Sequence, residues 1–219
     1  TKLDASGNCK STVIYRWNPV TANFTTAAKL VTSGPSQTDH FEADGLQYVI
    51  VAENFNRTVS VYRIYGSALI SLEKVQALTV PGSGAVAVGY SHGQIYLATA
   101  SYIFKKRPSY IFRWNRDKTQ FEPFQELDAC APHDVEFGDI NGVLHMVFSE
   151  DRIGKNSTIT SQVFRLDPEA KKFVYVQEVP TDGAHAAELF TDLFGWSWMV
   201  FAEFGDRLGE RYAAKSTLW

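Results

Sequence analysis

Histidine and acidic residues are the side chains of this sequence best suited to metal binding or acid–base chemistry. His40, His133 and His185 each lie near the start of a predicted strand, and His133, Asp134 and Glu136 together resemble a metal-ligand cluster. Alternate residues of a strand point to opposite faces, so simple pleating does not bring these three side chains onto one face. We therefore predict no metal site.

Glutamate recurs at the end of a predicted strand in three places, at Glu53, Glu150 and Glu203. A pair of carboxylates can carry out glycoside hydrolysis. A repeated acid is explained more simply by a solvated strand end or by a hydrogen bond to the adjacent loop. The sequence shows no nucleophile elbow, glycine-rich phosphate loop or Cys–His pairing. We therefore predict a non-enzymatic protein with no catalytic residue and no cofactor.

A repeat of roughly 50 residues positions these side chains. An aromatic residue followed by arginine marks each copy, at Tyr15-Arg16, Tyr62-Arg63, Phe112-Arg113 and Phe164-Arg165. A turn glycine marks the same interval independently, at Gly45, Gly93, Gly142 and Gly195. We expect each of these arginines to bind a carboxylate or carbonyl of the sheet, or blade, to which it belongs.

Each repeat is predicted to hold four short strands. The repeats cover residues 24–65, 69–114, 121–166 and 173–219, with residues 11–17 an extra copy of the fourth strand and residues 1–10 a polar lead-in. The third strand is apolar on both faces and must be covered on both sides. Sheets packed face to face as blades supply that cover. We therefore predict an all-β fold, a β-propeller of four-stranded antiparallel blades forming a single domain over residues 11–219.

The number of repeats leaves the assembly open. Our first prediction is a four-bladed ring completed within one chain, because a chain of 219 residues can bury the core of one domain. The alternatives are a piece of a longer array and half of a ring formed by a homodimer.

The third repeat carries the most complete motif. HDVEFGDINGVLHMVFSE occupies residues 133–150, preceded by FEPFQEL at 121–127 and SYIFRWN at 109–115. These segments resemble the EAR repeat, also called the epitempin repeat, and LQYVIVAEN at 46–54 and FVYVQEV at 173–179 are similar to it in the first and fourth copies. The resemblance covers roughly residues 11–219 and implies a β-propeller in an extracellular protein that binds receptors, as in the leucine-rich glioma-inactivated group.

The sequence departs from that family in two respects. It has four repeats where the family is usually described with seven. The acidic residue early in the family's second strand is present here as Asp134, whereas Gln37, Ala85 and Ala187 stand in the corresponding places. The resemblance therefore does not imply a cation held by a ring of acids.

Composition and sequons favour secretion. A net charge of −3 and a pI near 5.9 argue against the basic surface expected for binding nucleic acid or an anionic membrane. No apolar run approaches the roughly 20 residues of a membrane span. Asn23, Asn56 and Asn156 begin glycosylation sequons. Cys9 and Cys130 can form one bridge or two intermolecular ones.

Function is predicted to reside in the loops between third and fourth strands, which differ most between repeats. The charged residues predicted to form this recognition face are Lys105, Lys106, Arg107, Asp151, Arg152, Asp206, Arg207 and Arg211. We predict that this face binds an extracellular protein. The alternative is a lectin that binds glycans multivalently through equivalent pockets.

Overall fold

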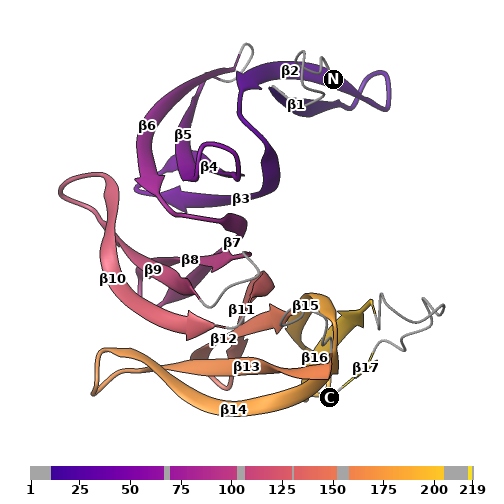
Figure 1. Ribbon diagram of the computed structural model, residues 1–219. Coiled ribbons are helices and arrows are strands. Elements are labelled where there is room, and N and C mark those ends of the chain that lie inside the picture. The colour runs from indigo at the N-terminus through magenta and orange to yellow at the C-terminus, as the bar shows by residue number, and fades with distance from the viewer. Residues whose placement is uncertain are drawn as a thin grey trace. The chain divides into compact units, whose positions relative to one another are not determined.

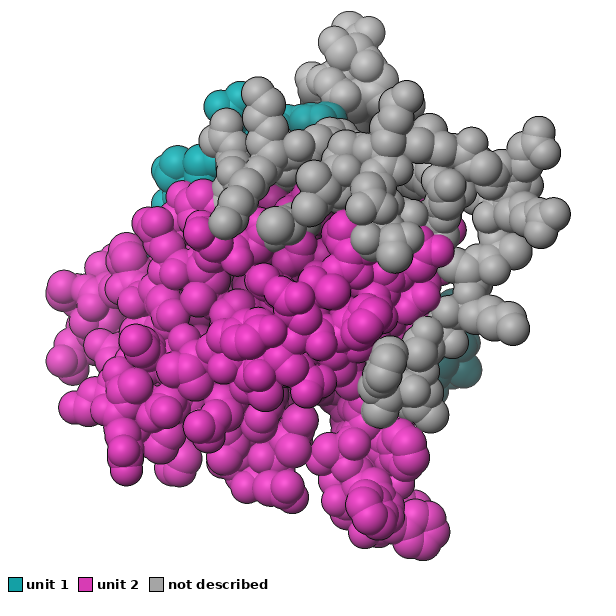
Figure 2. Space-filling view, turned by 60° about the horizontal axis from the view of Figure 1, so that its bottom comes forward, with its two compact units in different colours: residues 1–83 teal, residues 84–219 magenta. Residues whose placement is uncertain are grey.

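The chain divides into two compact units, and each is described by itself. In this computed structural model the described residues are 11–66, 70–102, 107–129, 131–151, 158–204 and 217–218. Unit 1 comprises Thr1–Ser83 and unit 2 comprises Gly84–Trp219 (Figure 2). The predicted lead-in at residues 1–10 lies outside the described residues, and the prediction of a single domain over residues 11–219 stays a prediction.

Unit 1 consists of two antiparallel sheets (Figure 1). Its strands are β1 (Ser11–Asn18), β2 (Asn23–Val31), β3 (Pro35–Ala43), β4 (Leu46–Glu53), β5 (Thr58–Tyr65) and β6 (Ser71–Thr79). β1 pairs with β2, and the second sheet has the order β3-β4-β5-β6. Leu30 of β2, Val51 of β4 and Tyr62 of β5 form a buried cluster that packs the two sheets together.

Unit 2 contains three further sheets. Its strands are β7 (Ser83–Ser91, beginning at the last residue of unit 1), β8 (Gln94–Ser101), β9 (Arg107–Asn115), β10 (Gln120–Ala129), β11 (Pro132–Ile140), β12 (Val143–Glu150), β13 (Thr158–Asp167), β14 (Lys172–Asp182), β15 (Ala184–Thr191), β16 (Ser197–Glu203) and β17 (Thr217–Leu218). The sheets are β7-β8-β9-β10, β11-β12-β13-β14 and β15-β16-β17. The predicted all-β fold of four-stranded antiparallel sheets is confirmed. The described residues form five sheets, of which three have four strands.

The sheets are offset by one strand from the sequence repeats. Each complete sheet combines the second, third and fourth strands of one repeat with the first strand of the next, as β6 adds to β3-β4-β5. A repeat period fixes how often a pattern returns, but it does not fix which strands pair. Strand β1, the extra copy of the fourth strand, accordingly pairs with the first strand of the next repeat, β2, in the same way that β5 pairs with β6.

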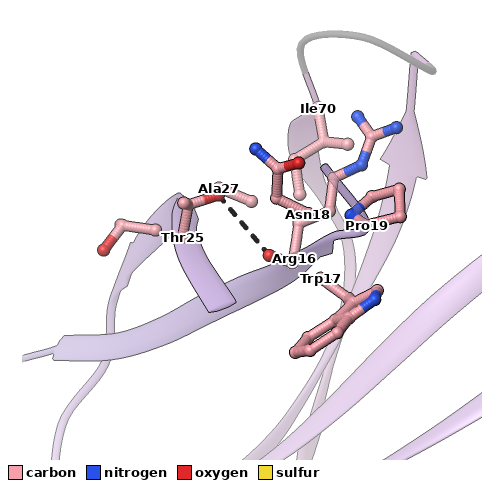
Figure 3. Close-up of a pocket in the computed structure, with 8 residues that line it drawn as sticks. Arg16, Trp17, Asn18, Pro19, Thr25, Ala27 and Ile70 are labelled. Atoms are coloured by element: carbon pink, nitrogen blue, oxygen red, sulfur yellow. Dashed lines mark hydrogen bonds between the residues drawn. The ribbon is translucent and has the colours of Figure 1, made fainter. Parts of the chain in front are cut away.

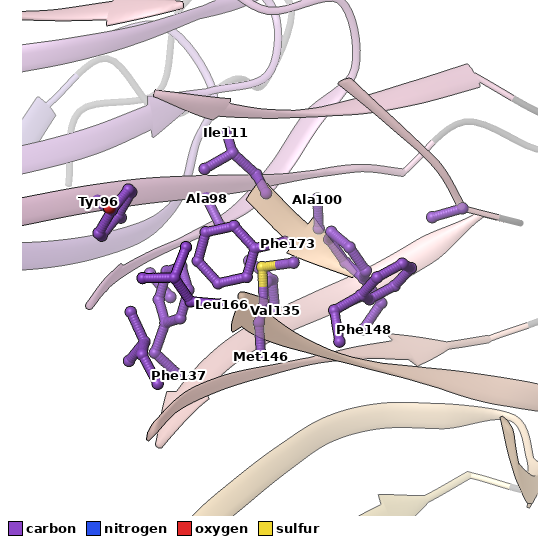
Figure 4. Packing of buried hydrophobic residues seen from close by; sticks show 14 of the residues in the cluster. Tyr96, Ala98, Ala100, Ile111, Val135, Phe137, Met146, Phe148, Leu166 and Phe173 are labelled. Carbon is purple, nitrogen blue, oxygen red and sulfur yellow. The ribbon is translucent and has the colours of Figure 1, made fainter. Parts of the chain in front are cut away.

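The core of unit 2 lies between neighbouring sheets (Figure 4). Its largest cluster includes Tyr96, Ile111, Val135, Phe137, Met146, Phe148, Phe164 and Phe173. Strand β12 is buried on both faces from Met146 to Glu150, and β4 is buried from Ile50 to Glu53, as predicted for third strands. β16 is less covered, because Trp198, Val200, Ala202 and Glu203 retain exposed surface.

The turn glycines lie in similar surroundings in three of the four sheets that contain them. Asp44-Gly45, His92-Gly93 and Asn141-Gly142 each form a two-residue hairpin turn in which both residues have positive φ. Such turns match the twist of the flanking strands. Gly195 also has a positive φ of 85°, but it lies in a longer loop, residues 192–196, between β15 and β16.

Asp192 organises this longer loop. Its carboxylate accepts hydrogen bonds from the Trp198 indole (2.8 Å) and from the backbone amides of Phe194 and Trp196 (2.9 Å each). The Trp198 hydrogen bond, followed by those from the loop amides, holds the pKa of Asp192 below its ordinary value.

Acidification should therefore release the loop. Because the pKa of Asp192 is depressed in the folded state, its stabilising effect is present above the unfolded pKa and is lost as the pH falls through the folded value. We expect the Trp198 indole N–H resonance to shift with a midpoint below the ordinary pKa of an aspartate. An NMR titration of the wild type against Asp192→Asn measures this, and an indole shift with an ordinary aspartate midpoint would contradict it.

Candidate functional site

Two bulged histidines lie side by side in unit 2. The pairing of β11 with β12 shifts register between Pro132 and Asp134, and that of β15 with β16 shifts between Ala184 and Ala186. His133 and His185 are the extra residues, and a bulge re-aims the side chain it carries. Their rings stack with centroids 4.0 Å apart and an interplanar angle of 20°. Nδ1 of His133 lies 3.0 Å from the carbonyl oxygen of His185.

A buried carboxylate borders the histidine pair. The side chain of Asp151, directly after β12, is 3% exposed, and its Oδ2 accepts a hydrogen bond from the Tyr102 hydroxyl at 2.8 Å. Its Oδ1 lies 3.4 Å from Nε2 of His185. Tyr102 directly follows β8, so these contacts join the starts of two loops to the start of β15.

Phe204 completes the group on the other side of His185. It directly follows β16, and its ring stacks on His185 at 4.8 Å with an interplanar angle of 18°. The ring of Tyr102 meets His133 edge-on at 4.8 Å. We call Tyr102, His133, Asp151, His185 and Phe204 the loop-base cluster. It offers stacked aromatic faces and imidazole nitrogens next to a fixed carboxylate, groups suited to binding.

The sequence prediction named only Asp151 of this cluster as a binding residue. Tyr102, Asp151 and Phe204 each follow the last residue of a third strand, so the repeat itself could have revealed them. His40 does not belong with the other two histidines: it is exposed and pairs with Val49 in the middle of β3.

The three strand-end glutamates occupy equivalent positions, because each pairs with the first residue of the neighbouring strand. The pairs are Glu53 with Pro35, Glu150 with Pro132 and Glu203 with Ala184. Solvation does not explain Glu53 or Glu150, because each is 1% exposed. The predicted hydrogen bond to the adjacent loop is confirmed for Glu53, which accepts from the backbone amide of Ser33 at 2.8 Å.

Asp134 connects two strands of unit 2. Its Oδ2 accepts a hydrogen bond from the backbone amide of Ala187 at 3.3 Å, linking β11 to β15. The residues that occupy the position of Asp134 in β3 and β15 are Gln37 and Ala186. The sequence predicted Gln37 correctly, but it predicted Ala187 in β15, which is wrong by one residue because of the bulge at His185. In the described parts of the chain no three His, Cys, Asp or Glu side chains form a group that could hold a metal ion.

Two of the recurring arginines pair within their own sheet. Nη2 of Arg63 lies 3.0 Å from a carboxylate oxygen of Glu73, and Arg165 lies 3.9 Å from Asp167. Arg113 instead places its guanidinium over the ring of Phe124, 5.5 Å from its centroid.

Most of the other predicted site residues lie outside the described ranges. Arg107 begins β9, although its side chain is not described. Asn23 and Asn56 are exposed, as glycosylation requires. The predicted residues that lie outside the described ranges are Lys105, Lys106, Arg152, Asp206, Arg207, Arg211, Asn156, Cys9 and Cys130.

Unit 1 has a separate open pocket of about 370 Å³ beside the β1–β2 turn (Figure 3). A hydrogen bond of 3.4 Å from the Thr25 hydroxyl to the carbonyl oxygen of Arg16 joins its two walls. The lining residues are Arg16, Trp17, Asn18, Pro19, Thr25, Thr26, Ala27 and Ile70. Arg16 alone among them is ionisable, and a single cation provides no acid–base pair.

Comparison with known proteins gives a distant link to the EAR repeat. The chain is 25% identical over 165 residues to the thrombospondin-type laminin G domain and EAR repeat-containing protein of Mus musculus, covering 74% of this chain. Identity to the Homo sapiens protein of the same name is 26% over 156 residues, covering 70% of this chain. The chain spans 24% and 23% of the lengths of these relatives. No protein-family model matches the chain.

Solved structures with similar folds support a β-propeller-like, all-β architecture. A protein from Lactobacillus plantarum matches with a TM-score of 0.53 and 15% identity over 81% of this chain and 53% of its own. An exo-β-1,3-galactanase from Clostridium thermocellum gives 0.52 and 9% identity over 86% of this chain and 48% of its own. An exo-β-1,3-galactanase from Phanerochaete chrysosporium gives 0.51 and 9% identity over 91% and 57%. At these identities the similarity concerns the fold alone.

No helix among the described residues is long and apolar enough to cross a membrane.

Proposed function

We propose that this chain is a secreted, non-enzymatic recognition module that binds an extracellular protein. The binding surface is the end of the unit 2 sheets where the loops after β8, β12 and β16 begin. The loop-base cluster supports this assignment, because Tyr102, Asp151 and Phe204 come from the starts of those three loops and meet around the stacked pair of His133 and His185. A rigid base that gathers divergent loops is a common arrangement for recognition.

Loosening this base should weaken binding. Tyr102→Phe removes the hydrogen bond to buried Asp151, and His185→Ala removes the ring stacked between His133 and Phe204. We expect the double variant to bind its partner at least tenfold more weakly, a loss of about 1.4 kcal/mol. Binding would be measured by interferometry, after screening the wild type against an array of receptor ectodomains.

Asp117→Asn is the matched control. Asp117 is exposed in the turn between β9 and β10, at the other end of its sheet. We expect this variant to bind like the wild type. If the double variant binds as tightly as the wild type and its thermal unfolding is unchanged, the loop-base cluster is not part of the binding surface.

A lectin is the second candidate, and the stacked rings of His133, His185 and Phe204 beside a carboxylate favour it. Aromatic faces and fixed polar groups are typical of small-ligand sites. A glycan array with red-cell agglutination distinguishes the two: inhibition by a simple sugar would establish the lectin in place of protein recognition.

We further propose that the sheets are blades of a β-propeller, with a four-bladed ring in one chain preferred over part of a larger ring or a homodimer. Native mass spectrometry measures the copy number directly. A mass of one chain agrees with the four-bladed proposal, whereas a stable dimer favours the shared ring.

Secretion predicts specific modifications. We propose glycans at Asn23, Asn56 and Asn156 and a disulfide between Cys9 and Cys130. Expression through a eukaryotic secretory pathway, followed by enzymatic deglycosylation and non-reducing peptide mapping, measures both.

A further inference from the structure

The loop between β15 and β16 differs in chemistry from the other hairpin turns. The corresponding turns in the other sheets are Asp44-Gly45, His92-Gly93 and Asn141-Gly142, which are short and polar. The β15–β16 loop is longer and reads Asp192-Leu193-Phe194-Gly195-Trp196. It lies at the end of its sheet opposite to His185 and Phe204, since both of these residues flank the far ends of β15 and β16.

The apolar side chains of this loop project into solvent. Leu193 is 102% exposed, Phe194 is 88% exposed and Trp196 is 69% exposed. Leaving three large apolar side chains in water is unfavourable, and grouped exposure of this kind marks an interaction site.

The loop is nevertheless held in one conformation. Besides the carboxylate contacts of Asp192, the amide of Asp192 donates to the carbonyl of Trp196 at 2.9 Å, and the amide of Gly195 donates to the carbonyl of Asp192 at 3.1 Å. The amides of Asp192, Phe194, Gly195 and Trp196 therefore all have partners inside the loop. Below it, the hydroxyls of Thr191 and Ser197 lie 3.1 Å apart and form a polar base.

We propose that this loop inserts Leu193, Phe194 and Trp196 into the interfacial region of a neutral lipid bilayer. Unpaired backbone groups are costly where water becomes scarce, and the amides of Asp192, Phe194, Gly195 and Trp196, four of the five in the loop, have partners inside it. Leucine and phenylalanine stand at the apex, while tryptophan, which prefers the membrane interface, stands nearer the base.

The charge of the loop selects the kind of lipid. Residues 188–198 include Glu188 and Asp192 but no lysine or arginine. Anionic headgroups therefore gain no attraction from this loop, and binding should not depend on salt. An apolar pocket in a partner protein is the competing occupant. Such a pocket would commonly supply hydrogen bonds to the loop backbone, whereas four of the five loop amides already have partners inside the loop.

Vesicle sedimentation with the full chain tests the proposal. We expect binding to phosphatidylcholine vesicles that is the same in 0.1 and about 0.5 M salt. Leu193→Ser combined with Phe194→Ser should weaken this binding at least tenfold, since each change removes a large apolar side chain from the bilayer. Val20→Ser is the matched control, because Val20 is 91% exposed in the β1–β2 turn, and it should bind like the wild type.

Three outcomes would overturn the proposal. They are no sedimentation with phosphatidylcholine vesicles, binding only to phosphatidylserine vesicles that is lost in high salt, and equal binding by the wild type and the double variant. Asp192→Ala gives a further readout: the apolar residues remain but the carboxylate that orders them is gone, so weaker vesicle binding by this variant supports presentation by a fixed loop. These outcomes are independent of protein recognition at the loop-base cluster.

Discussion

Gly138→Ala should destabilise unit 2 by about 1–3 kcal/mol, the usual cost of overpacking a core. A Cβ at this position of β11 would overlap Cβ of Leu189 on β15 and would lie 3.3 Å from the Leu189 carbonyl oxygen. Neither of these atoms can move away by a change of rotamer. The two strands must therefore separate, which weakens the core cluster containing Val147, Leu189 and Phe201.

Urea unfolding of two comparison variants tests whether the overlap with Leu189 causes the loss of stability. Gly89→Ala places its Cβ 2.7 Å from the ring of Phe137, a side chain that can tilt, so its cost should be smaller. Gly142 has open space around it and a φ of 80°, so Gly142→Ala should cost only about 1 kcal/mol of backbone strain. A Gly138→Ala protein as stable as the wild type would show that β11 and β15 do not approach at this glycine.

Glu53→Ala should destabilise unit 1 by about 1–3 kcal/mol for each buried donor that loses its acceptor. The carboxylate accepts hydrogen bonds from the Ser33 amide and the Ser60 hydroxyl, and Nζ of Lys74 lies 3.5 Å away. Both Glu53 and Ser60 are fully or almost fully buried, so water cannot replace the lost acceptor at Ser60.

Chemical denaturation of matched variants measures this effect. Glu53→Gln keeps one acceptor oxygen and should fall between the alanine variant and the wild type. Glu42→Ala is the control: Glu42 is exposed on the neighbouring strand and accepts a hydrogen bond from Gln47. Its cost should stay within about 0.5 kcal/mol. Equal stability of Glu53→Ala and Glu42→Ala would mean that the strand-end acid has no structural role.

The repeat was visible in the sequence because it rests on local chemistry. A two-residue hairpin turn needs positive φ, so the glycines at 45, 93 and 142 recur wherever such a turn is built. Strands buried on both faces likewise require continuous apolar runs, as in β4 and β12. These are properties of single segments, and single segments can be read from sequence.

Pairing and bulges could not be read in the same way. Periodicity did not show that β6 joins the sheet of the preceding strands, because the same order of strands allows either grouping. The bulges at His133 and His185 arise from the register between two strands, which the sequence of a single strand does not specify. The loop-base cluster was therefore predicted only through Asp151.

The footprint of a bound extracellular protein, measured by hydrogen–deuterium exchange, tests the central functional claim most directly. We expect protection to concentrate in peptides containing Tyr102, residues 131–134, Asp151, residues 183–186 and Phe204. Protection confined to the opposite turns, at residues 92–93, 141–142 and 191–197, with none at the loop-base cluster, would contradict the proposed recognition surface.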